Sequence, residues 1–193
     1  PEIRIELEER TSLWTIEGLL ARQADLGIVV RGFETEGLEA FPYGSDNLCL
    51  AVPRGHRLAR RKTIRLSEIA REELVSLDGS SAVHRHVMAR AREAGKLLRI
   101  RVQVRSFEVM CQIIAQGLGV GILPGQAAKP LAGALGLSLL RIDEPWAARE
   151  FCICVHAANA LPLPARRLLD ALMGSTGEAC RQRRAEVGSA KRR

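Results

Sequence analysis

The chain has 193 residues, of which 47% are apolar and 26% charged, and its formal net charge is +7. These proportions are typical of a soluble globular protein with one domain or two small lobes. No apolar run approaches the roughly 18–20 residues that a membrane span requires, and charged residues interrupt the first ten positions, where a secretory signal needs an apolar core. We therefore expect neither a membrane protein nor an exported one.

Much of the positive charge lies at the C-terminal end. Residues 174–193 hold six Lys or Arg and two Glu, a net charge of +4, which leaves +3 for the other 173 residues. A net charge that small over residues 1–173 does not indicate a basic surface for binding nucleic acid. The tail lacks apolar periodicity, so we expect a disordered, solvated end or, alternatively, a non-specific phosphate-binding arm.

Strands and helices are predicted to alternate from the N-terminus onward. Residues 3–7 alternate apolar and charged side chains, as a half-buried strand does. Thr11 and Ser12 can cap a helix whose apolar residues keep helical spacing up to Leu20. The other elements expected in this half are a strand at 26–30 buried on both faces, a turn-rich stretch over 31–44, a strand at 48–52 and a short helix at 66–70.

The second half continues this alternation. Strands are expected at 74–77, 100–104, 120–123, 137–142 and 151–155. Helices are expected at 82–94 before Gly95, from Ser106 to Gly117 with Val109, Ile113 and Ile114 facing inward, and at 165–173. Strands that alternate with helices of this size indicate an α/β architecture with largely parallel sheets.

Short hydroxyl side chains lie at three predicted strand-to-helix junctions: Thr11 and Ser12, Ser80 and Ser81, and Ser106. Each hydroxyl can simply cap its own helix. Helix N-termini also carry unpaired amides and partial positive charge, and open α/β sheets bind ligands at the carboxyl ends of their strands. The junctions are therefore candidate sites for an anion or carboxylate.

Signals for catalysis or metal binding are weak. His84 and Arg85, in the first turn of a predicted helix, could donate to a ligand or simply be exposed. The sequence contains no Gly-x-Ser-x-Gly, Walker or His-Glu-x-x-His motif, and its five cysteines form no Cys-x-x-Cys pair. Buried thiols in a reducing cytoplasm are the default, with a redox pair or zinc site as the alternative. We predict no catalytic residue, no metal ligand and no cofactor.

Several segments resemble those of LysR-type transcriptional regulators. Residues 115–124, Ala-Gln-Gly-Leu-Gly-Val-Gly-Ile-Leu-Pro, resemble the glycine-rich helix-to-strand segment of that family. Residues 52–59, Val-Pro-Arg-Gly-His-Arg-Leu-Ala, are similar to the family's crossover into its second lobe, and residues 25–29 to the end of its first lobe. The matches occur in family order and together cover residues 1–173.

The resemblance implies an α/β effector-binding domain with two lobes, like a type II periplasmic binding protein. Lobe I would comprise residues 1–52 and 153–173, lobe II residues 53–152, and a disordered basic tail residues 174–193. Two crossover strands would join the lobes. The implied ligand contacts between the lobes are Thr11 and Ser12 from lobe I, and Ser80, Ser81 and Ser106 from lobe II. His84, in the helix that follows Ser81, is a further candidate ligand contact because of its position beside these serines.

The resemblance also implies the partners: a small organic anion or carboxylate as effector, a cytoplasmic homodimer or tetramer, and DNA bound through an N-terminal winged helix-turn-helix. That DNA-binding part, and the strand and helix that open lobe I in the family, are not in this sequence, so we expect a fragment or an unrecorded start. The solute-binding protein of a transporter is the alternative function. An enzyme with the same fold ranks third, because the sequence shows no pair of residues with the features of a catalytic nucleophile and its base.

Overall fold

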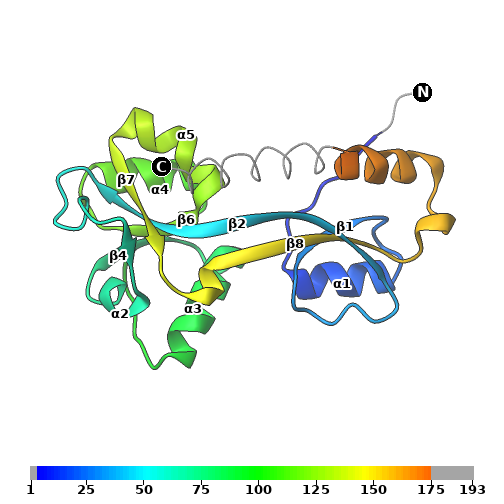
Figure 1. Ribbon diagram of the computed structural model, residues 1–193, viewed down its shortest axis with the longest axis horizontal. Helices are drawn as coiled ribbons and strands as arrows, with labels where there is room; N and C mark the ends of the chain where they lie inside the picture. The colour runs from blue at the N-terminus through cyan, green and yellow to red at the C-terminus, as the bar shows by residue number, and fades with distance from the viewer. Residues whose placement is uncertain (1–3, 175–193) are drawn as a thin grey trace, which may run out of the picture. The chain divides into compact units, whose positions relative to one another are not determined.

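The computed structural model describes residues 4–174, which divide into two compact units (Figure 1). Unit 2 is Asp46–Arg149, and unit 1 comprises the residues before and after it. Both boundaries fall inside strands, β2 (Glu39–Pro53) and β8 (Ala148–Val155), so each of these strands contributes residues to both units. Apart from Gly174, the predicted disordered tail lies outside the described residues.

Most predicted elements are present, together with some that were not predicted. Unit 1 contains α1 (Ser12–Leu20), β1 (Gly27–Val30), the short 3-10 helix η2 (Ala158–Ala160) and a helical segment over residues 163–174. Unit 2 contains β3 (Thr63–Ile64), α2 (Leu66–Ile69), β4 (Glu73–Leu77), α3 (Ala82–Glu93), β5 (Arg99–Val104), α4 (Phe107–Ala115), β6 (Gly121–Pro124), α5 (Gly125–Leu135), β7 (Leu137–Ile142) and the 3-10 helix η1 (Pro145–Ala147). Of these, β3, α5 and the two 3-10 helices were not predicted.

The sheets are mixed, so the expectation of largely parallel pairing is wrong. The larger sheet has the order β1-β8-β2-β7-β3, with β6 also paired to β2. Its β1–β8, β2–β6 and β2–β7 pairs are antiparallel, whereas β3–β7 is parallel. The smaller sheet consists of β4 and β5, which are parallel. A mixed α/β fold results, as predicted for the fold class.

In unit 1, helix α1 packs against strand β1. Ile16 and Leu19 on the helix form an apolar cluster with Val29 and Cys154. A side chain at Gly27 would not fit without a shift of the helix side chains, because its Cβ would clash with Thr15 Cγ2 and lie 3.0 Å from Leu19 Cδ1. The helix begins at the predicted N-cap, Thr11, whose Oγ1 accepts a hydrogen bond from the Trp14 amide at 3.3 Å.

In unit 2, the core lies on both faces of strand β2. Leu48, Leu50 and Val52 belong to one buried cluster, whereas Cys49 and Ala51 belong to another, as the period of two along a strand requires. Helix α3 contributes Val83, Val87 and Ala91 to the first cluster, and α4 contributes Met110, Cys111 and Ile114 to the second. The two helices whose N-termini carry the predicted site, α3 and α4, are therefore each fixed by packing in a buried apolar cluster.

Two predicted strands differ from the structure. Residues 4–7 form no strand, and Leu7 is 91% exposed. Alternating side chains make a strand only where a neighbouring strand supplies hydrogen bonds, and no described strand pairs with this segment. The strand expected at 26–30 is present as β1 but is not buried on both faces, because Ile28 is 47% exposed.

Three further expectations were wrong in the middle of the chain. The stretch expected to be turn-rich includes residues 39–44 of the long strand β2, where Phe41 and Tyr43 pack against a buried cluster around Val155. Helix α5, which contains Pro130, was not predicted. In α4, Val109 faces outward and is 42% exposed, whereas its neighbour Met110 is fully buried.

Candidate functional site

Parallel pairing of β4 and β5 brings two strand-to-helix junctions together in unit 2. The register places Leu77 opposite Val104 at the carboxyl ends of the strands. Directly beyond, the Asp78 amide donates a hydrogen bond to the Val104 carbonyl at 2.9 Å. The loops that lead into α3 and α4 therefore start side by side, and Ser80, Ser81 and Ser106 lie at one edge of this sheet.

Two of these serines cap their helices, as predicted. The Ser106 Oγ accepts a hydrogen bond from the Glu108 amide at 3.2 Å. The Ser81 Oγ accepts one from the His84 amide at 3.5 Å, the outer limit for such a bond. A helix end whose cap is this long keeps hydrogen-bonding capacity in its first-turn amides.

Asp78 and Arg105 connect the two loops, although neither was predicted from the sequence as a site residue. Arg105 Nε lies 3.2 Å from Asp78 Oδ2, although the Arg105 side chain is 92% exposed. The Ser80 amide donates to Asp78 Oδ1 at 3.0 Å, and the Ser80 hydroxyl donates to the same oxygen. Hydrogen bonding from Ser80 and, secondarily, the charge of Arg105 hold the pKa of Asp78 below its usual value. Ser80 therefore organises the loop and does not cap α3.

His84 points to the sheet. Its Nδ1 lies 2.9 Å from the hydroxyl of Ser76 on β4. Burial and, secondarily, the charge of Arg85 lower the pKa of His84 below its ordinary value of 6.5. The imidazole is consequently neutral near pH 7, so it offers a ligand a hydrogen bond and no full positive charge.

A small cavity of about 20 Å³ lies beside this histidine. Ser76 and His84 supply its polar lining, and the remaining wall is apolar: Leu74, Val75, Leu77, Val83, Val87, Met88, Leu98, Ile100 and Ile122. A cavity of this volume is about the size of one water molecule. An organic ligand at this edge would therefore bind on the loops and helix ends, outside the cavity.

Positive charge at the helix N-termini comes from two arginines. The Arg85 side chain is exposed in the first turn of α3, and its Nη1 donates a hydrogen bond to the Gly79 carbonyl at 2.7 Å. Arg105 immediately precedes the N-cap of α4. Together with the partial positive charge of two helix ends, these guanidinium groups favour an anion at the edge formed by the β4 and β5 junctions.

The hydroxyl groups of unit 1 have structural partners. Thr11 caps α1, whereas Ser12 is the first helical residue and its Oγ accepts the Val30 amide at 3.0 Å. This bond joins the start of α1 to the end of β1. The structure therefore gives both residues a role in unit 1, and their predicted contact with a ligand stays a prediction.

Within residues 4–174, no group of three or more His, Cys, Asp or Glu side chains is arranged to hold a metal ion. The four cysteines in this range are free thiols, and Cys180 lies outside it. Burial raises the pKa of Cys49 and of Cys154 to about 12, so these thiols stay protonated near neutral pH. None of the helices described is long and apolar enough to cross a membrane.

Comparison with known families decides what kind of domain this is. The sequence profile described as the LysR substrate binding domain matches residues 1–176. This chain belongs to that family. The resemblance seen in the glycine-rich segment and the crossover segment is thereby confirmed.

The relatives of this LysR substrate binding domain are transcription regulators. The chain is 25% identical over 133 residues to a protein of Trichormus variabilis named as a probable RuBisCO transcriptional regulator, covering 66% of this chain and 40% of that protein. It is 26% identical over 177 residues to the nitrogen assimilation regulatory protein nac of Klebsiella aerogenes, covering 90% of this chain and 56% of that protein. The chain thus spans about half the length of these relatives.

Solved structures show the same fold. The CcmR regulatory domain of Synechocystis PCC6803, solved in complex with 2-PG, has a TM-score of 0.72 at 23% identity, over 86% of this chain and 80% of that one. The effector binding domain of QuiR, solved in complex with shikimate, has a TM-score of 0.68 at 17% identity, over 87% and 79% of the two chains. At these identities the likeness establishes that this LysR domain has an effector-domain fold.

Proposed function

We propose that this domain senses a small organic anion for a bacterial LysR-type transcription regulator and that it is not an enzyme. Family membership supports the regulatory role. The observation that carries the choice of ligand is the pair of helix N-termini, α3 and α4, side by side at the carboxyl ends of β4 and β5. Ser81 and Ser106, with the guanidinium groups of Arg85 and Arg105, supply the donors that a carboxylate or phosphate accepts from.

The related domains support this class of ligand. CcmR was solved with 2-PG and QuiR with shikimate, and both ligands are acidic small molecules. Asp78 restricts where an anion can bind here, because its carboxylate is already negative and engaged with Ser80 and Arg105. The favoured position is against the first turns of α3 and α4, with the charged groups of the ligand directed away from Asp78.

The larger assembly belongs to the same proposal. Units 1 and 2 would be the two lobes of the effector domain, with Thr11 and Ser12 as the ligand contacts of the first lobe. The regulator would act in the cytoplasm as a homodimer or tetramer and bind DNA through a winged helix-turn-helix outside this chain. Relatives named as HTH-type transcriptional regulators support the DNA-binding part.

The hydrogen bond between Ser76 and His84 is the feature closest to a catalytic pair. A serine nucleophile needs space for a substrate carbonyl and donors for the oxyanion. The cavity beside Ser76 is the size of one water molecule, and the rest of its wall is apolar. These surroundings support a structural bond between α3 and β4 rather than acyl transfer.

The test is a pair of substitutions at Ser106 that preserve the helix cap. Asn and Asp both cap helices as well as Ser does, so Ser106→Asn and Ser106→Asp should leave the melting temperature within a few degrees of the parent. Only Asp places a negative charge where the anion would bind. We would then screen carboxylates and phosphate esters by thermal shift. We expect at least one compound to raise the melting temperature of the parent and of the Asn variant but not that of the Asp variant.

The corresponding pair at Ser81 repeats the test at the start of α3. Equal affinity of the same anion for the Asp and Asn variants at both serines would exclude this edge of unit 2 as its site. If no anion stabilises the parent, the proposal of an organic anion as effector fails, although the family assignment stands.

A further inference from the structure

Charge is unevenly distributed over residues 1–173. Residues 46–149 hold 17 Lys or Arg against nine Asp or Glu, a net charge of +8. The other residues up to residue 173 include six Lys or Arg and 11 Asp or Glu, which gives a net charge of −5. These two values sum to the net charge of +3 for residues 1–173, a total too small to indicate a nucleic-acid-binding surface by itself. The total concealed a basic unit 2 and an acidic remainder of residues 1–173.

The positive charge of unit 2 is concentrated in the segment 54–71. It contains seven basic side chains and one acidic side chain: Arg54, Arg57, Arg60, Arg61, Lys62, Arg65 and Arg71 against Glu68. The segment forms the turn after β2, the short strand β3 and the helix α2. All seven basic residues are exposed.

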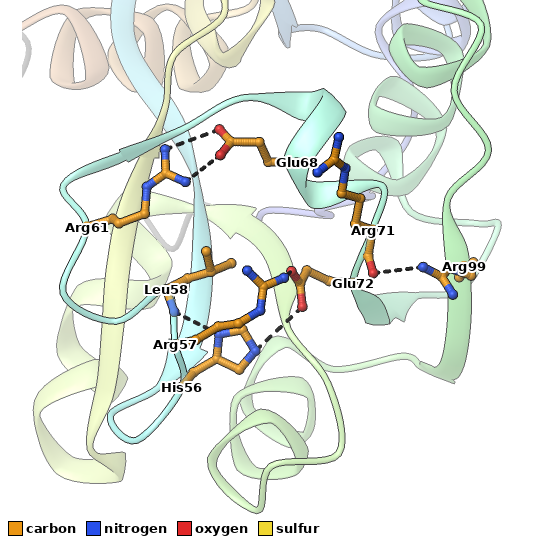
Figure 2. Close-up of polar contacts among 8 residues, drawn as sticks. All are labelled: His56, Arg57, Leu58, Arg61, Glu68, Arg71, Glu72 and Arg99. Carbon is orange, nitrogen blue, oxygen red and sulfur yellow. Dashed lines mark hydrogen bonds and ion pairs between the residues drawn. The ribbon is translucent and has the colours of Figure 1, made fainter.

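Ion pairs hold the two halves of this segment together, as Figure 2 shows. Arg61 pairs with Glu68 across the turn, and Arg57 pairs with Glu72, a residue whose side chain is only 11% exposed. His56 contributes a second contact to Glu72, with its Nε2 3.6 Å from the carboxylate, and its Nδ1 accepts the Leu58 amide at 3.3 Å. Glu68 and Glu72 are thus already paired with residues of the segment, and these contacts hold its backbone in place.

Five of the seven cations form no ion pair with any described residue: Arg54, Arg60, Lys62, Arg65 and Arg71. Arg71 is joined to strand β5 through its backbone, because its carbonyl accepts a hydrogen bond from Arg99 Nη2 at 2.8 Å (Figure 2). Arg99 itself is paired with an acidic residue, because its Nη1 lies 3.7 Å from Glu73 Oε1.

The surface offers cations but no apolar anchor. The large apolar side chains of the segment, Leu58, Ile64, Leu66 and Ile69, are at most 4% exposed. Protein interfaces draw most of their energy from buried aromatic and apolar anchors, whereas binding to a nucleic-acid backbone needs only positive charges and hydrogen-bond donors. Six of the seven cations are arginines, whose planar fork matches a phosphate group.

We propose that the segment 54–71 is a second DNA-contacting surface, which binds the phosphate backbone of duplex DNA without reading its sequence. It is separate from the edge formed by the β4 and β5 junctions and does not depend on the identity of the effector. In a regulator held on DNA by another domain, such a surface would contribute affinity and position the effector domain against the duplex. Its contribution would fall steeply with salt concentration.

The experiment compares two triple variants of the full chain by fluorescence anisotropy with a short labelled DNA duplex. Arg60→Gln/Lys62→Gln/Arg65→Gln removes three unpaired cations from the segment. Arg22→Gln/Lys129→Gln/Arg166→Gln removes three exposed cations elsewhere, so net charge and the C-terminal tail are the same in both. We expect the first to lose about tenfold or more in affinity and the second to lose little. The slope of log K against log salt should fall by about 2–3 only in the first.

A charge-preserving variant and a second polyanion complete the test. Arg60→Lys/Arg65→Lys keeps the charge and should keep DNA binding within a few fold of the parent. Equal losses of DNA affinity in the two triple variants would overturn the proposal, because affinity would then depend on total charge or on the C-terminal tail and not on the segment 54–71. If polyglutamate binds the parent more tightly than DNA and is the ligand lost in the first triple variant, the partner is an acidic protein and not DNA. Circular dichroism melts confirm that all variants fold.

Discussion

His84 shows how one contact decides the chemistry of a site residue. The sequence placed it in the first turn of a helix beside two serines, which left its role open between ligand donor and exposed side chain. The structure places Nδ1 at 2.9 Å from Ser76 Oγ, so one ring nitrogen already has a partner on β4. Only Nε2 then remains for a ligand.

The lowered pKa of His84 predicts a pH dependence of stability. Burial makes protonation harder in the folded state than in the unfolded chain, where the pKa is near 6.5. As the pH falls below about 6.5, the unfolded chain binds the proton first and the free energy of unfolding decreases, until the pH passes the folded pKa and the loss levels off. The stabilisation is fully present above the unfolded value.

The measurement is urea unfolding of the parent and of His84→Gln from about pH 7 to about pH 5. We expect the parent to lose stability more steeply than the variant, since Gln does not titrate. His86, whose pKa is also lowered by burial, contributes the same background to both proteins. An NMR titration midpoint of His84 above 6.5, or parallel stability curves, would contradict the burial of its imidazole in the neutral form.

At the scale of elements, local patterns predicted most of the helices and strands of unit 2. N-cap chemistry is local, so Ser81 and Ser106 were identifiable from sequence as the starts of α3 and α4. Helix α5 was not predicted, and it contains Pro130 at an interior position, where proline normally costs about 3 kcal/mol. Burial of Ala128 and Ala132 in the core offsets that cost, and packing of this kind is not visible in a local pattern.

The candidate site was predictable only in part. Its serines follow from local rules, whereas the ion pair of Asp78 with Arg105 depends on the parallel register of β4 and β5. Residues 27 positions apart meet there only because the two strands pair. The one available signal was that Arg105 stands between a predicted strand and a predicted N-cap, a position close to any ligand at a helix start.

The glycine-rich segment between α4 and β6 makes a prediction about packing. Its glycines follow a helix and precede a strand, a context that favours a tight turn and close packing over a phosphate-binding loop. A Cβ at Gly121 would lie 2.7 Å from Ile114 Cδ1 and 3.0 Å from the Val75 carbonyl oxygen, so there is no space for a side chain. Gly121→Ala should lower the free energy of unfolding by about 1–3 kcal/mol.

Gly133 in α5 is the matched control for Gly121. Its Cβ would meet no atom within 4 Å, and it lies in a helix, where alanine is favoured by up to about 1 kcal/mol. Urea unfolding should therefore show opposite signs for Gly121→Ala and Gly133→Ala. A neutral effect at Gly121 would show that α4 can move away from β6 without cost.

At the scale of the whole molecule, the positions where the chain passes from one unit to the other are marked by a buried ion pair. Asp46 on β2 and Arg149 on β8 are the first and last residues of unit 2. Their side chains are 10% and 9% exposed, and Arg149 Nη2 lies 3.0 Å from Asp46 Oδ2. The other carboxylate oxygen accepts the Asn47 amide at 2.7 Å and the Gln126 amide, at the start of α5, at 3.4 Å.

Breaking this pair should lower the free energy of unfolding far more than breaking a surface ion pair of unit 2. Removing one partner of a buried ion pair leaves the other charge in a dry environment, which typically costs about 3–5 kcal/mol, whereas an exposed pair contributes at most about 1 kcal/mol. We expect Asp46→Ala to lower the free energy of unfolding by the larger amount. Glu93→Ala, which breaks the exposed Arg90–Glu93 pair, should change it little.

The double variant Asp46→Leu/Arg149→Met separates the cost of a stranded charge from the value of the pair itself. Apolar replacement of both partners is often close to neutral in other proteins, because neither charge then has to be desolvated. If the pair only avoids a stranded charge, urea unfolding of the double variant should recover most of the stability lost in Asp46→Ala. If stability stays low, the hydrogen bonds from Asn47 and Gln126 are what the carboxylate chiefly provides, and Asp46→Asn, which keeps an acceptor oxygen, should then recover more than the double variant.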